Sequence, residues 1–120
     1  MEIHLAQARD ANLIAPLFDA YRQFYKAASD IEASSQFILE RLTNDESVIF
    51  LAMKGEGALG FIQLYPLFAS VALQSLWLLN DLFVHPSARK QGGGRRFDET
   101  RRAICTRDRQ PRAVFAYSHG

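Results

Sequence analysis

The chain has 120 residues, 48% of them hydrophobic and 22% charged, which is the size and composition of one globular domain. No apolar run approaches the roughly 18 residues that a membrane span requires, and no basic segment followed by an apolar stretch opens the sequence, so we expect neither a membrane protein nor a secretory signal. The net charge of +1 divides into −5 over residues 1–88 (five Lys/Arg, ten Asp/Glu) and +6 over residues 89–120 (nine Lys/Arg, three Asp/Glu). This contrast predicts that residues 89–120 bind an anion or were formed under a different constraint from the rest of the chain.

The N-terminal part predicts one strand and one helix. Residues 2–8 alternate loosely between apolar and polar side chains, as a strand does. Asp10 can then accept a hydrogen bond from an unpaired backbone N–H as the N-cap of a helix, whose apolar face recurs from Leu13 to Tyr25. Pro16 lies inside this helix and removes one of its hydrogen bonds, so we expect a bend there.

A second helix is predicted from Ile31 to Leu42, because Asp30 can cap it and apolar side chains recur at helical spacing. The polar residues 43–46 end this helix. We expect three of its side chains to face inward, namely Phe37, Ile38 and Leu42.

Three strands with turns between them are predicted next, over residues 48–53, 58–65 and 73–84. Gly55 and Gly57 lie in the first turn and can adopt positive φ. Pro66 has no N–H for a sheet and is expected to end the second strand, residues 68–72 to form a loop, and Pro86 to stop the third strand. The resulting order of β-α-α-β-β-β predicts an α+β fold with helices packed on a mostly antiparallel sheet.

The strongest chemical signal follows the last of these strands. The strand runs into Pro86 and then into an Arg-x-x-Gly-x-Gly pattern formed by Arg89, Gly92 and Gly94. The glycines let the backbone approach an anion closely, Arg89 and Lys90 supply full charges, and the helix expected after them adds partial positive charge. The pattern predicts a phosphate cradle, but it completes neither the P-loop motif nor the Gly-x-Gly-x-x-Gly dinucleotide motif.

With Val84 and Pro86 in front of it, this pattern resembles the Val-x-Pro-x-x-Arg-x-x-Gly-x-Gly segment of the GCN5-related N-acetyltransferase (GNAT) family. The order of the upstream strands also agrees with that family, and residues 79–84 are similar to the corresponding strand of its polyamine (spermidine/spermine) branch. The resemblance covers about residues 2–95 and implies one GNAT-like domain over residues 1–120. It further implies acetyl-CoA as co-substrate and acetyl transfer to a primary amine of a small molecule.

The resemblance also implies which residues bind acetyl-CoA. The backbone of the strand would receive the pantetheine arm, and backbone N–H groups in the turn would hold the pyrophosphate. The residues concerned are Leu82, Phe83, Val84, Arg89, Lys90, Gln91, Gly92, Gly93, Gly94 and Arg95.

Two consecutive residues are candidates for catalysis, because an attacking amine must be neutral and needs a base or a relayed water nearby. Asn80 stands where the polyamine branch has a Glu, and it can orient a water. Asp81 is the adjacent carboxylate, but strand alternation predicts that its side chain points to the opposite face of the sheet. The alternative for both is hydrogen bonding at a strand edge or cap. Near the acceptor we expect Tyr21, Tyr25 and Asp30, although such aromatics more often belong to the core.

Residues 96–120 depart from the family pattern. Arginines replace most of the apolar face of the next helix, and the family's further helix, strands and tyrosine general acid are missing, although a last strand is predicted at 113–117. One hypothesis is a reading-frame change near codon 93, and the other is a short variant. Either one leaves an open sheet edge, which predicts a homodimer.

Two other classes of function stay open. A non-catalytic CoA-binding or dimerisation module would keep the fold without the chemistry. A nucleic-acid binder would use the Arg-rich end, but the acidic residues 1–88 show no basic face, so we expect no nucleic-acid partner. The single cysteine, Cys105, allows no internal disulfide and fits the cytoplasm, and three scattered histidines without ligand spacing predict no metal site.

Overall fold

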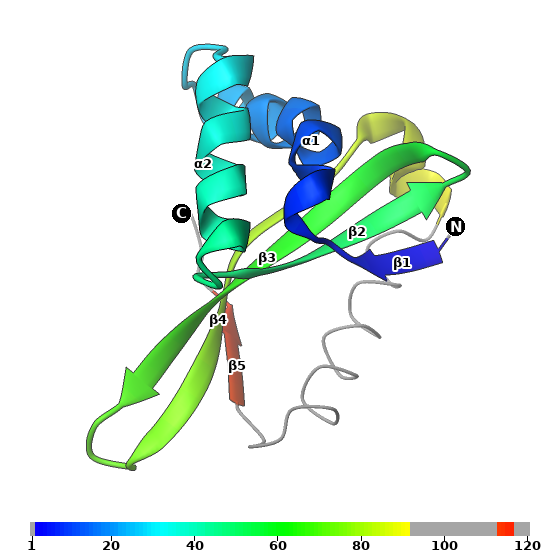
Figure 1. Ribbon diagram of the computed structural model, residues 1–120. Coiled ribbons are helices and arrows are strands. Elements are labelled where there is room, and N and C mark those ends of the chain that lie inside the picture. The colour runs from blue at the N-terminus through cyan, green and yellow to red at the C-terminus, as the bar shows by residue number, and fades with distance from the viewer. Residues whose placement is uncertain (1, 92–112, 117–120) are drawn as a thin grey trace.

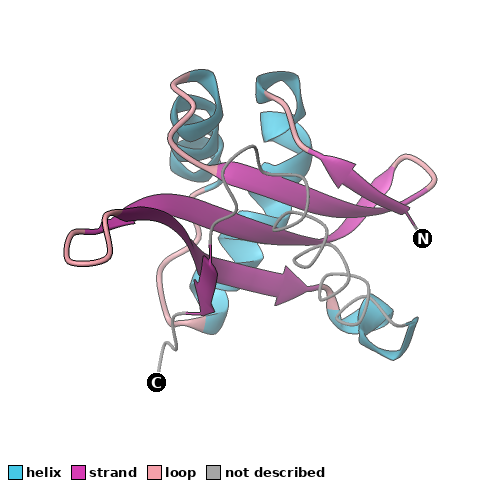
Figure 2. Ribbon diagram, turned by 90° about the horizontal axis from the view of Figure 1, so that it is seen from below, coloured by secondary structure: helices cyan, strands magenta, loops and turns pink. Residues whose placement is uncertain are grey.

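A five-stranded sheet with two helices on one face makes up the computed structural model, which describes residues 2–91 and 113–116 (Figure 1). Figure 2 views the sheet from the other side, with the two long helices behind it. The α+β class and the order β-α-α-β-β-β are as predicted. The elements are β1 (Glu2–Leu5), the 3₁₀ turn η1 (Ala8–Asp10), α1 (Ala11–Phe24), α2 (Ile31–Thr43), β2 (Val48–Lys54), β3 (Gly57–Ala69), β4 (Gln74–Val84), the 3₁₀ helix η2 (Pro86–Gln91) and β5 (Ala113–Ala116).

The strands lie in the sheet in sequence order, β1-β2-β3-β4-β5. Neighbours from β1 to β4 are antiparallel, whereas β5 runs parallel to β4 and pairs with Leu76–Leu79. β5 confirms the strand predicted at 113–117. The chain leaves the sheet after β1 for the two helices and returns at β2, and β2, β3 and β4 then follow one another as hairpins.

The main core lies between the helices and the sheet. The helices contribute apolar residues at helical spacing and the strands contribute alternate residues, so two apolar faces meet. Ile14 of α1, Ile38 of α2 and Phe61 of β3 have no exposed surface. Full burial of such a side chain contributes about 1.5–3 kcal/mol relative to exposure. A second apolar cluster, which includes Ile62 and Leu64 of β3, lies on the other face of the sheet.

The predicted side-chain capping bond is present at the N-terminus of α2 and absent at that of α1. Asp30 caps α2, because its Oδ1 accepts a hydrogen bond from the N–H of Ala33 at 3.0 Å. Asp10 is the N-cap residue of α1 as predicted, but its carboxylate makes no capping bond there: it accepts the N–H of Gln7 at 2.8 Å, which caps η1. α1 continues through Pro16, and a bend there stays a prediction.

The inward face of α2 agrees only in part with the prediction. Ile38 is fully buried, and Leu42 is partly buried against the main core. Phe37 remains 38% exposed, since it stacks on Phe18 of α1 with ring centroids 5.7 Å apart near the outer side of the helix pair. Phe37 therefore packs against α1 and is partly exposed to solvent, instead of facing the sheet.

β3 is longer than predicted, and Pro66 does not end it. Pro66 pairs with Trp77 of β4, and the β3–β4 pairing continues beyond it. The pairing of β2 with β3 ends at Leu64, so Pro66 lies where β3 is an edge strand and a missing N–H costs no hydrogen bond to β2. The predicted loop at 68–72 is replaced by a turn at 70–73.

Two features are not found within the residues that the structure describes. No helix is long and apolar enough to cross a bilayer. No group of three or more His, Cys, Asp or Glu side chains is placed to hold a metal ion.

Candidate active site

β4 contains a bulge at Asn80. Leu79 pairs with Leu64 of β3 and Asp81 pairs with Gln63, so Asn80 is one extra residue on β4. An extra residue breaks the alternation of side chains, which places Leu79 and Asp81 on opposite faces of the sheet although they are two positions apart. Leu79 joins the far-face cluster, and Asp81 turns toward the helices.

The side chains of Asn80 and Asp81 lie on the same side of the strand. Nδ2 of Asn80 donates a hydrogen bond to Oδ1 of Asp81 at 3.1 Å. The prediction that Asp81 points to the opposite face is therefore wrong, because it assumed a regular strand. Asp81 is only 5% exposed, so its carboxylate is buried beneath the helix pair.

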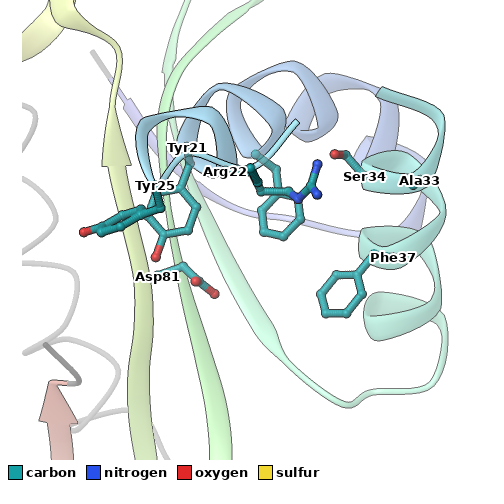
Figure 3. A pocket seen from close by; sticks show the side chains of 9 residues that line it. Tyr21, Arg22, Tyr25, Ala33, Ser34, Phe37 and Asp81 are labelled. Atoms are coloured by element: carbon teal, nitrogen blue, oxygen red, sulfur yellow. The ribbon is translucent and has the colours of Figure 1, made fainter. Parts of the chain in front are cut away.

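Two further side chains hold the Asp81 carboxylate. Nε2 of Gln63, which has no exposed surface, donates to Oδ2 of Asp81 at 2.8 Å. The hydroxyl of Tyr21 lies toward the same carboxylate (Figure 3), and burial, the charge of Asp81 and a hydrogen bond with Asp81 raise the pKa of Tyr21 well above its usual value. Burial and the charge of Asp81 also raise the pKa of Tyr65 to about 12. Both phenols therefore stay protonated at neutral pH, and Tyr21 acts as a hydrogen-bond donor.

A cavity of about 450 Å³ opens beside Asp81, between α1, α2 and β4 (Figure 3). Of the predicted acceptor residues, Tyr21 and Tyr25 line it. Asp30 does not, because its carboxylate caps α2 instead. The full lining is Phe18, Tyr21, Arg22, Tyr25, Ala27, Ala33, Ser34, Phe37 and Asp81.

Asp19 of α1 ties together the wall of this cavity and is 2% exposed. Its carboxylate accepts hydrogen bonds from Ser29 Oγ (2.7 Å), the N–H of Asp30 (2.7 Å), Gln23 Nε2 (3.0 Å) and Ser34 Oγ (3.3 Å), and it pairs with Arg22 Nη1 at 3.5 Å. The bonds from Ser29, Asp30 and Ser34 and the charge of Arg22 hold the pKa of Asp19 below its usual value. This carboxylate thus fixes the loop between the two helices.

The predicted pantetheine-binding residues follow the bulge on β4. Within the described residues, the β4–β5 pairing covers Leu76–Leu79, directly before the bulge. Beyond it, Leu82 is 44% exposed, whereas Phe83 and Val84 are each 8% exposed. The ring centroids of Phe83 and Tyr21 lie 6.2 Å apart in the main core. Because the Phe83 side chain packs in this core, only the backbone of Phe83 is suited to bind a ligand.

The sequence and the fold resemble those of known proteins, whereas no protein-family model matches the sequence. The chain is 49% identical over 96 residues to an uncharacterized N-acetyltransferase of Bacillus subtilis (strain 168), YhfO, covering 80% of this chain and 64% of that protein. It is 38% identical over 85 residues to a probable acetyltransferase of Haemophilus influenzae, covering 70% and 58%. A crystal structure of a probable acetyltransferase, 35% identical, superposes with a TM-score of 0.88 over 99% of this chain and 80% of that one. The chain belongs to the GNAT family of acetyltransferases.

The chain spans 64% and 58% of the lengths of these two curated GNAT relatives. The likeness to the solved acetyltransferase confirms the predicted GNAT fold. Membership of the polyamine branch stays a prediction, and so does the origin of residues 96–120, most of which lie outside the described residues.

The turn that carries the GNAT motif is described in part. After β4, the N–H of His85 donates to the carbonyl of Leu59 at 2.7 Å, and the His85 Nδ1 lies 2.8 Å from Ser87 Oγ, so His85 closes the strand end. Arg89, Lys90 and Gln91 belong to the following 3₁₀ helix. Gly92, Gly93, Gly94 and Arg95 lie outside the described residues, and the phosphate cradle stays a prediction.

Several residues of the GNAT site were not predicted from the sequence. Gln63 and Asp19 could have been predicted from the sequence, because each is a polar residue at an inward position of an otherwise apolar strand or helix face. The sequence could not predict that Arg22, Phe18 and Phe37 line the site, since their positions there depend on how α1 crosses α2.

Proposed function

We propose that the protein transfers an acetyl group from acetyl-CoA to a primary amine of a small molecule. The observation that carries the proposal is the bulge at Asn80, which turns the buried Asp81 carboxylate into the cavity, directly before residues 82–84, to which the family resemblance assigns the pantetheine arm. An acceptor site and a place for an extended donor therefore adjoin each other on one strand.

The donor side of the proposal rests on β4 beyond the bulge. Acetyl-CoA supplies a thioester whose acetyl carbon the amine nitrogen attacks, with release of the CoA thiolate. Its pantetheine arm is an extended chain with two amides, and such a chain binds alongside a strand through backbone hydrogen bonds. The exposure of Leu82 next to the buried Phe83 and Val84 fits recognition through the backbone. The positively charged turn after Pro86 fits the pyrophosphate.

The acceptor side rests on Asp81. Its carboxylate offers about four acceptor positions, of which Gln63 and Asn80 use two and Tyr21 a third. Asp81 lines the cavity, so its remaining acceptor capacity suits an ammonium group bound there. The amine must lose a proton before it attacks, and Asp81 is placed to accept it directly or through a water. The proposed roles are thus Asp81 as proton acceptor and Asn80, Gln63 and Tyr21 as positioning residues.

The test is acetyl transfer by the purified chain. Acetyl-CoA is incubated with a panel of primary amines, release of CoA thiol is followed with a chromogenic disulfide, and the acetylated amine is identified by mass spectrometry. Acetyl-CoA at 100 times its dissociation constant should also stabilise the fold by about 2.7 kcal/mol. Stabilisation without transfer would favour the non-catalytic CoA-binding module, and the absence of both would reject the proposal.

A further inference from the structure

We infer that the acceptor carries a single positive charge on an apolar, preferably aromatic body, and that polyamines are poor acceptors. This inference deepens the proposed function and rests on it. Three properties of the 450 Å³ cavity carry it: the chemistry of its walls, the number of carboxylates among its described lining residues, and the position of Arg22.

Four of the nine described lining residues of the cavity are aromatic. Phe18 and Phe37 stack with ring centroids 5.7 Å apart and planes at 4°, and Tyr21 meets Tyr25 edge to face at 5.3 Å. These contacts hold the rings in place, so much of the wall is a flat apolar surface. The polar side chains beside it include Arg22, Ser34 and Asp81. Aromatic faces bind apolar and aromatic bodies through offset or edge contacts, and they also attract an ammonium group.

Asp81 is the only carboxylate among the lining residues in the described part of the chain. Asp19 lies just behind the wall, but its acceptor positions are already taken by Ser29, Asp30, Gln23 and Ser34. It is also 2% exposed, so it has no surface to offer a ligand. The cavity therefore neutralises one ammonium group and leaves a second one without a carboxylate, which is costly in a partly desolvated site.

Arg22 places a positive charge away from Asp81 in the cavity. In Figure 3 its guanidinium lies toward Ser34 on α2, whereas the Asp81 carboxylate lies by Tyr21 and Tyr25. The contacts of Arg22 with Asp19 (3.5 Å) and with the carbonyl of Ala28 (3.1 Å) both use Nη1. Among the residues that the structure describes, neither Nε nor Nη2 of Arg22 has a hydrogen-bond or ion-pair partner, so both can donate to an oxygen of the acceptor. The far end of the acceptor is thus expected to be neutral or anionic.

The test measures binding of three amines of equal length to the purified chain by isothermal titration calorimetry. Hexylamine, 1,6-diaminohexane and 6-aminohexanoate differ only in the group at the far end. We expect hexylamine to bind about ten-fold more tightly than the diamine, and 6-aminohexanoate to bind at least as tightly as hexylamine. 2-Phenylethylamine should bind more tightly than 2-cyclohexylethylamine, because the walls are aromatic.

Two variants separate the role of Arg22 from general charge effects. Arg22→Gln should remove most of the discrimination between hexylamine and the diamine. Arg9→Gln removes the same charge from an exposed residue outside the cavity and should leave the discrimination intact. The inference alone is overturned when the diamine or spermidine binds and is acetylated best. Absence of both amine binding and CoA release overturns the proposed function together with it.

Discussion

Nδ2 of Asn80 donates a hydrogen bond to Oδ1 of Asp81 at 3.1 Å, although the two residues are consecutive in a strand. Consecutive side chains of a regular strand point to opposite faces, so this contact requires the bulge. The bulge turns a carboxylate toward the helices, and it directly precedes the part of β4 proposed to bind the donor, so two consequences can be tested. The main predictions test these consequences separately.

Deletion of Asn80 should abolish acetyl-CoA binding without unfolding the protein. Leu79 and Asp81 would then be consecutive opposite Leu64 and Gln63, and normal alternation would keep each on its present face. Only the bulge is lost, so β4 becomes regular and the part of it proposed for the donor changes its course. Calorimetric titration with acetyl-CoA measures the binding, and circular dichroism checks the fold.

The matched control for this deletion is Asn80→Ala. It keeps the length of β4, and hence the bulge, while it removes the hydrogen bond to Asp81. Acetyl-CoA binding should be little changed in this variant, whereas turnover should fall. Unaltered acetyl-CoA affinity in the deletion variant would show that the bulge does not open the donor site.

Asp81→Asn should lower kcat/KM by about 10²–10⁴-fold, the range for loss of a general base. The fold should persist, because Oε1 of Gln63 has no partner among the described residues and a flipped Gln63 amide can accept from the new side chain. Thermal melting should therefore change little while steady-state turnover collapses. Retention of more than half of the activity would exclude Asp81 as the proton acceptor.

The fold was largely predictable from the sequence because periodicity and turn residues agree along residues 2–84. The errors have local physical causes. Pro66 was expected to end a strand, but the edge position removes the cost of its missing N–H. Asp10 is both the last residue of η1 and the N-cap residue of α1, and its carboxylate caps η1 instead of α1.

The site was less predictable than the fold. Tyr21 and Tyr25 were placed correctly near the cavity because they share a helix face. The orientation of Asp81 was not predictable, because a bulge depends on the register with β3, which no pattern within β4 records. The cavity itself arises from the crossing of α1 and α2 over the sheet, which is a tertiary property.

Gln63→Leu should destabilise the fold by about 1–3 kcal/mol, measured as the free energy of unfolding in urea, because the buried Asp81 carboxylate loses a hydrogen-bond donor. The comparison is the double variant Gln63→Leu/Asp81→Leu. The hydrogen bond between Gln63 and Asp81 can be lost only once, so the double variant should lose less stability than the sum of the losses in Gln63→Leu and Asp81→Leu. Strictly additive losses would mean that the two side chains do not interact.

Stability should decrease in acid through Asp19. Its pKa is lowered in the folded state, chiefly by the hydrogen bonds from Ser29 and the N–H of Asp30. The stabilisation is therefore complete above the unfolded pKa of about 3.9 and is lost as the pH falls through the lower folded pKa. Asp19→Asn should lower the melting temperature at pH 7 and flatten the acid dependence. Asp45→Asn, at an exposed carboxylate, should do neither.

Self-association should depend on the tip of the β3–β4 hairpin, which projects away from the helices in Figure 1. Phe68, Val71 and Leu73 are 81%, 103% and 90% exposed there, and contiguous exposed apolar side chains mark interaction surfaces. We predict a homodimer that Val71→Glu/Leu73→Glu converts to a monomer, measured by light scattering across a concentration series. Leu5→Glu introduces a charge at another exposed apolar residue and should leave the dimer intact. A monomeric wild-type chain at all concentrations would contradict the prediction, since the exposed tip would then have no second copy to contact.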